Sequence, residues 1–124
     1  MNVTINVTET FKRLAKPLLK KYPSLKSELS ELENELLNSP RLGEQLGNDA
    51  YKIRVAVQSK GKGKRGGMRV ISYVETIIFI SNNQKSEQIE VNLISIYDKG
   101  KTATLSNQEI KNLIYNIRLR KLKF

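Results

Sequence analysis

The spacing of the apolar residues changes from a helical to a strand period near residue 50, so the fold must combine helices with sheet. Residues 11–22 and 25–36 place Phe, Leu and Tyr side chains at helical spacing, and Pro23 between them should end or bend the first helix. Residues 3–7 alternate apolar and polar side chains, as does the segment from Tyr51 onward. The sequence therefore predicts a short strand, then a helical hairpin, then a run of strands.

Turn-forming residues divide the second part of the chain. Residues 38–49 are rich in Gly, Asn and Pro and predict a loop, residues 51–57 predict a strand, and residues 59–67 predict a loop rich in Gly and Lys. Residues 68–80 form either one long strand or two strands broken near Glu75, residues 81–86 a polar turn, and residues 89–97 the last strand. Ser106 and Glu109 form a capping box that begins a final helix. We expect one domain, residues 1–124, of the α+β class, with helices packed on a mainly antiparallel sheet of about four strands.

The residue types that are absent narrow the chemistry. The chain has no cysteine and no histidine, which excludes disulfides, thiol nucleophiles, imidazole bases and the usual zinc clusters. We find neither a secretory signal nor an apolar run near the ~20 residues of a spanning helix, so we expect a cytoplasmic protein without a membrane partner. Any reaction must use Lys, Arg, Tyr, Asp, Glu, Ser or Thr.

The positive charge is concentrated in one part of the chain. The net charge is +10, and residues 50–74 contain no acidic residue. The seven basic residues of this segment are Lys52, Arg54, Lys60, Lys62, Lys64, Arg65 and Arg69. Lys52 and Arg54 share one face of the predicted strand, and the loop glycines allow backbone amides to approach a phosphate closely. This pattern favours a polyanion or an acidic protein as partner, the alternative being an ordinary solvated surface.

The Gly- and Lys-rich loop matches the dinucleotide-binding fingerprint at Gly61, Gly63 and Gly66. That fingerprint needs a helix directly after its last glycine to hold the pyrophosphate, and a strand is predicted here instead. We therefore expect no nucleotide cofactor, and no other small-molecule cofactor.

Three segments carry a resemblance to a known family: YKIRV at 51–55, GKRGGMRVI at 63–71 and LISIYDK at 93–99. In this order the chain resembles the RelE/ParE toxin superfamily over nearly its whole length, and within it the HigB-like branch. The resemblance implies a RelE-like fold and the toxin of a type II toxin–antitoxin module. It also implies a metal-independent, ribosome-dependent endoribonuclease that cleaves mRNA during translation, with an antitoxin as partner. In the family, the 2′-hydroxyl of the RNA attacks the adjacent phosphate.

The resemblance also implies the site residues. Lys52 and Arg54 match the basic pair of the family's strand, and Arg69 matches the arginine after the glycine turn. Lys52 is the candidate base, provided that neighbouring positive charge lowers its pKa, whereas Arg54 and Arg69 are too basic to titrate and would hold phosphate. Tyr97 would stack on a base or shuttle a proton, the alternative being an aromatic that packs at a strand end. Further RNA contacts are expected from Lys60, Lys62, Lys64, Arg65 and Lys99.

The chain also departs from the family pattern. Some members carry a catalytic tyrosine in the C-terminal segment, where this chain has ATLS at 103–106, and the histidines of other members are absent. The general acid and base are therefore left open. Two other functions remain open as well: a non-enzymatic, ParE-like inhibitor of a protein target such as gyrase, and an RNA- or partner-binding module without catalysis.

Overall fold

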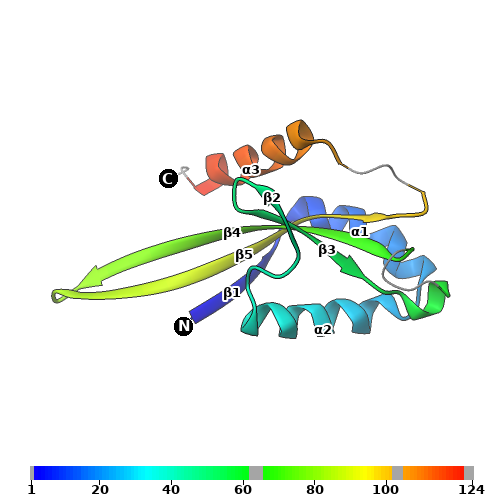
Figure 1. Cartoon of the computed structure of the whole chain (residues 1–124), viewed down its shortest axis with the longest axis horizontal. Helices are drawn as coiled ribbons and strands as arrows, with labels where there is room; N and C mark the ends of the chain where they lie inside the picture. Colours follow the sequence, from blue (N-terminus) through cyan, green and yellow to red (C-terminus); the bar gives the residue numbers. More distant parts are fainter. Residues whose placement is uncertain (1, 62–65, 102–104, 122–124) are drawn as a thin grey trace.

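A computed structural model describes residues 2–61, 66–101 and 105–121 as a mixed sheet with helices on both faces (Figure 1). The elements in chain order are β1 (Asn2–Val7), α1 (Glu9–Lys21), α2 (Leu25–Asn38), β2 (Glu44–Gly47), β3 (Ala50–Val55), the 3-10 turn η1 (Gln58–Lys60), β4 (Met68–Ser81), β5 (Gln84–Asp98) and α3 (Asn107–Lys121). The five strands lie in the order β1-β5-β4-β3-β2, with β1 parallel to β5 and the other pairs antiparallel. The predicted α+β class is confirmed.

The predicted number of about four strands is wrong, and the sheet is mixed. The additional strand, β2, lies inside the segment predicted as a loop. It spans only four residues, and only one of them, Leu46, is even partly buried. So short a segment shows no alternating pattern, and its strand character comes from pairing with β3.

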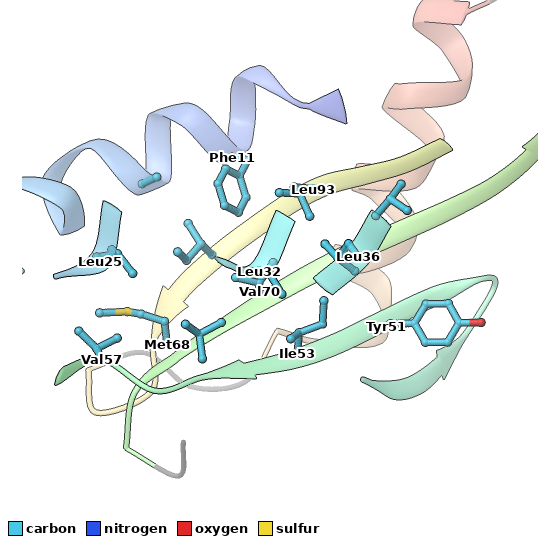
Figure 2. Close-up of a cluster of buried hydrophobic side chains, with 14 of the residues drawn as sticks. Phe11, Leu25, Leu32, Leu36, Tyr51, Ile53, Val57, Met68, Val70 and Leu93 are labelled. Atoms are coloured by element: carbon cyan, nitrogen blue, oxygen red, sulfur yellow. The ribbon is translucent and has the colours of Figure 1, made fainter. Parts of the chain in front are cut away.

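The helical hairpin α1–α2 covers one face of the sheet and forms the larger core (Figure 2). Phe11 of α1 and Leu25 and Leu36 of α2 pack against Met68 and Val70 of β4 there. The first helix begins at a Thr8 cap, whose hydroxyl accepts a hydrogen bond from the Phe11 amide at 3.2 Å. It ends at Lys21, two residues before Pro23, as the sequence predicts. This core fixes which side chains of the sheet must point to the opposite face.

Helix α3 covers part of that opposite face, above a smaller core (Figure 1). Ile110 and Ile114 of the helix belong to the same buried cluster as Ile71 and Tyr97 of the sheet. The predicted capping box is confirmed. The Glu109 amide donates to Ser106 Oγ at 3.1 Å, and the Ser106 amide donates to a Glu109 carboxylate oxygen at 3.2 Å.

The hairpin of β4 and β5 extends far beyond the rest of the sheet (Figure 1). Strand β3 pairs with β4 only as far as Tyr73, and β1 pairs with β5 only from Gln88 onward. Among the described residues, 76–81 of β4 therefore pair only with residues 84–89 of β5, and we call residues 76–87 the arm. Its turn is Asn82–Asn83, both with positive φ (52° and 64°), as in a type I′ turn. Of the two predicted alternatives for residues 68–80, the single strand is the one observed.

No helix within the described ranges has the length and apolar character needed to cross a membrane.

Candidate functional site

Three of the sequence-predicted site residues form a row across the sheet. Arg54 of β3 lies opposite Arg69 of β4, and Arg69 lies opposite Tyr97 of β5. Lys52 precedes Arg54 by two residues on the same strand face, about 7 Å away along the strand. All four lie on the face away from the helical hairpin, because Ile53, the residue between Lys52 and Arg54, packs into the larger core. Side chains from three strands are thus brought together.

The centre of the row is a pair of like charges. Arg54 is exposed, whereas Arg69 is only 4% exposed, and one guanidinium nitrogen of Arg69 donates to the Met68 carbonyl at 3.2 Å. Burial lowers the pKa of Arg69, the positive charge of Arg54 lowers it further, and Tyr97 acts in the opposite direction. Like charges directly opposite each other destabilise a sheet. An anion bound beside both guanidinium groups would offset that repulsion, so the pair is suited to a phosphate.

Lys52 has an acidic neighbour that the sequence analysis missed. Its Nζ lies 3.3 Å from a carboxylate oxygen of Glu44, and 19% of the Lys52 side chain is exposed. Strand β2 brings Glu44 directly opposite Lys52. The close approach of β2 to β3 depends on Gly43, whose φ is +108°. A Cβ added to this residue would lie 2.5 Å from the Lys52 carbonyl oxygen and would clash with it. Gly43 beside Glu44 was a signal for this close approach, although the segment was predicted as a loop.

Tyr97 is buried at the other end of the row. Its ring belongs to the smaller core under α3, and its hydroxyl oxygen is also buried, without a hydrogen-bond partner among the described residues. This burial agrees with the alternative that Tyr97 is an aromatic residue packed at a strand end. The side chain lies beside Arg69 and away from solvent, where it can position the guanidinium.

Lys60 is held by an ion pair with Asp98. Its Nζ donates to a carboxylate oxygen of Asp98 and, at 2.7 Å, to the Gly66 carbonyl. Asp98 is buried and also accepts hydrogen bonds from the Tyr22 hydroxyl at 3.1 Å and the Gly100 amide at 2.9 Å. Burial alone would raise the pKa of Asp98, but the hydrogen bonds and charge of these neighbours outweigh it and lower that pKa. This network anchors the loops at the inner end of β5.

The remaining predicted RNA contacts lie close to this network in sequence. Lys99 is exposed, and its backbone amide donates to the Gly67 carbonyl at 3.1 Å. Lys62, Lys64 and Arg65 lie outside the described residues. Lys99 is therefore the one residue of this group that the structure presents to solvent near Arg69 and Tyr97.

A groove with acidic side chains lies between α2 and β3, next to the row. A cavity of about 590 Å³ runs along β3, lined on one wall by Glu28, Glu31 and Glu35 of α2 and on the other by Lys52 and Arg54. A polyanion would be repelled from the α2 wall, so its approach is favoured from the face that carries the arginine row. Within residues 2–61, 66–101 and 105–121, no group of three or more acidic side chains is placed to hold a metal ion.

A scan against models of known protein families gives no match to this chain.

Proposed function

We propose that this chain is a RelE/HigB-like toxin of a type II toxin–antitoxin module, acting as a ribosome-dependent endoribonuclease on mRNA. The observation that supports the proposal most is the opposed pair Arg54 and Arg69, flanked by Lys52 on the same face. Two guanidinium groups facing each other across neighbouring strands cost stability, and a bound phosphodiester offsets that cost. The resemblance of the three sequence segments supplies the substrate class.

Side chains that the chain contains can carry out every step of the proposed reaction. The 2′-hydroxyl of the RNA loses its proton and attacks the adjacent phosphorus. The bond to the 5′-oxygen of the next nucleotide breaks, and that oxygen takes up a proton. A 2′,3′-cyclic phosphate and a 5′-hydroxyl end result. Negative charge grows on the phosphoryl oxygens during the attack, and Arg54 contacts them from the exposed side while Arg69 adds positive charge from below.

The paired side chains of Lys52 and Glu44 provide the proton transfers in this proposal. The Glu44 carboxylate is the proton acceptor, and the Lys52 ammonium, 3.3 Å from it, is the donor to the leaving oxygen. This assignment fills the position left open by the absence of histidine. Tyr97 acts as a positioning residue, because it is buried beside Arg69. In this proposal the substrate of the toxin is mRNA on the ribosome. An antitoxin encoded beside the toxin neutralises it.

The test is inducible expression without antitoxin, with growth followed and mRNA 5′ ends mapped. We compare wild type with Arg54→Ala and Glu44→Gln, and with Arg13→Ala as a matched control on the exposed side of α1. Wild type and Arg13→Ala should arrest growth and create new ends inside translated codons. Arg54→Ala should reduce cleavage by roughly 10²–10³-fold, the usual effect of removing one donor from a developing anion.

Three results would contradict the proposal. Growth arrest with intact transcripts would indicate a protein target such as gyrase. No arrest by the wild type would indicate a binding module without catalysis, whereas equal cleavage by wild type and Arg54→Ala would show that the arginine row is not the catalytic site.

A further inference from the structure

The arm carries its apolar side chains on one strand only. Residues 76–81 of β4 read Thr-Ile-Ile-Phe-Ile-Ser, whereas the paired residues 84–89 of β5 read Gln-Lys-Ser-Glu-Gln-Ile. Ile78, Phe79 and Ile80 are 51%, 49% and 78% exposed, the last being the most exposed large apolar side chain among the described residues. Large exposed apolar groups on a long edge strand mark a site for pairing with another chain.

The backbone of this strand also has an open edge. On its outer side, no described strand pairs with residues 76–81, since the pairing with β3 ends at Tyr73. In a two-residue hairpin, the residues that flank the turn bond to each other, and bonding then alternates along the strand. Ser81, Phe79 and Ile77 therefore direct their backbone groups toward β5, which leaves those of Thr76, Ile78 and Ile80 directed outward.

We propose that this open edge of β4 pairs with the same edge of a second copy of the chain, antiparallel and about a two-fold axis at Ile78. This register overlaps residues 76–80 of the open segment with the same residues of the second copy. Ile78 then lies opposite its own copy, Thr76 opposite Ile80, and Ile77 opposite Phe79. The sheets of the two copies join into one continuous sheet, the arrangement of an isologous dimer. This inference does not depend on the proposed nuclease function.

Charge supports a second copy as the occupant. A protein of net charge +10 repels itself, but residues 76–81 contain no charged side chain. The two charged residues of the arm, Lys85 and Glu87, have opposite signs and lie on β5, away from the open edge. The arginine row lies toward the other end of β4, so pairing of two arms keeps the strongly basic regions of the copies apart. The arm is thus a part of this chain where self-association meets little repulsion.

The inner end of the open edge has space for the tip of the other arm. A pocket of about 490 Å³ lies there, lined by Arg41, Asp49, Tyr73, Val74, Glu75, Thr76 and Arg118. In the proposed register, Ser81 of the second copy lies opposite Glu75, so its Asn82–Asn83 turn reaches this pocket. Arg41 already donates to the Thr76 hydroxyl at 3.4 Å, and the Arg118 Nε donates to the Tyr73 hydroxyl at 3.0 Å. Polar side chains therefore surround the place where the polar turn arrives.

The first test measures mass by sedimentation over a roughly hundredfold range of protein concentration. Wild type should shift from monomer to dimer, and Ile78→Lys, which places two ammonium groups opposite each other at the axis, should weaken dimerisation at least about tenfold. Ser86→Lys adds the same charge on the β5 side of the arm and should dimerise like wild type. Circular dichroism of the variants establishes that both are folded.

The second test fixes the register by disulfide capture, which is specific because the chain has no cysteine of its own. A cysteine at Ile78 meets its copy at a Cα separation of about 5.5 Å, within the range that a disulfide spans. A cysteine at Ile80 lies about 13 Å along the strand from its copy. Oxidation should therefore link Ile78→Cys into dimers and leave Ile80→Cys monomeric.

Several outcomes would overturn the proposal. A wild type that is monomeric throughout the range, or an Ile78→Lys variant that dimerises as well as wild type, removes the second copy as the occupant. Capture through Ile80→Cys but not Ile78→Cys contradicts the register. A monomer in which Ile78→Lys abolishes binding of the co-encoded antitoxin would assign the open edge to that protein instead.

Discussion

Strand β4 passes through two environments along its length. Residues 68–74 are buried between β3 and β5 with helices on both faces, whereas residues 76–81 pair, among the described strands, with β5 alone and are largely exposed. Both halves are rich in apolar side chains, so the difference comes from their neighbours and not from their composition. The inner half holds Arg69 in a rigid frame, and the outer half offers an unpaired edge. One continuous strand can thus carry the proposed anion site at its inner end and the proposed pairing edge at its outer end.

Loss of the Lys60–Asp98 ion pair should have the largest effect, because it anchors the inner end of the hairpin. Lys60→Met leaves the Asp98 carboxylate buried without its cation, and removing one partner of a buried pair costs about 3–5 kcal/mol. Urea denaturation measures the free energy of unfolding. Lys99→Met, an exposed neighbour with the same change of charge, is the control and should unfold like wild type. Equal effects of the two substitutions would show that the pair does not anchor the inner half.

Truncation of an isoleucine to alanine should lower the free energy of unfolding much more in the inner half of β4 than in the outer half. Ile71→Ala opens a cavity in the smaller core and should lower the free energy of unfolding by about 2–5 kcal/mol. Ile80→Ala removes the same atoms from an exposed site and should change it by less than about 0.5 kcal/mol. Both are measured by urea denaturation at a protein concentration low enough to keep the chain monomeric. Similar losses at both positions would mean that the arm is packed in solution.

Acid should weaken the inner half through Asp98. Since the folded protein lowers the pKa of Asp98, this carboxylate stabilises the fold above its unfolded-state pKa, near 3.9. That contribution is lost as the pH falls through the unfolded and then the lower folded pKa. The free energy of unfolding should therefore decrease below about pH 4 more steeply in wild type than in Asp98→Asn. Parallel pH profiles for the two proteins would remove Asp98 as a source of acid sensitivity.

A change in the arm's turn should have the smallest effect on global stability. Asn83 has a φ of 64°, so Asn83→Ala strains the turn by about 1–2 kcal/mol, whereas Asn83→Gly relieves it. Because the arm can open without the core, we expect hydrogen exchange of the arm amides to accelerate in Asn83→Ala while the urea midpoint barely moves. A midpoint that falls together with faster exchange in both halves would mean that the hairpin opens as one unit.

The sequence predicted local elements well where a single period runs through them. The alternation around Lys52 and Arg54 correctly separated the polar face of β3 from the face of Ile53, and the Ser106–Glu109 box marked the start of α3. The predicted break near Glu75 corresponds to a change of neighbours: the pairing with β3 stops at Tyr73, while the backbone of β4 continues.

Contacts between distant segments were beyond the sequence patterns. Spacing along β3 could not show that Arg69 lies opposite Arg54, because that register depends on the length of the loop between the strands. Lys60 looked like any other lysine of a basic loop, and its ion pair with Asp98 depends on a contact across 38 positions of the chain. Strand β1 read clearly as a strand, but its parallel pairing with β5 has no local signature.

The pairing of β1 with β5 sets an order of events during synthesis. Strand β1 is synthesised before its partner, residues 88–93, which follow about 80 positions later in the chain. Arg54 is likewise synthesised before Arg69 and Tyr97, and the row across the sheet is complete only when all three are paired. A growing chain therefore carries its helical hairpin without a sheet to cover it, and without the assembled row of Arg54, Arg69 and Tyr97. The row can therefore assemble only after Tyr97 has been translated, since contacts so distant in sequence form late.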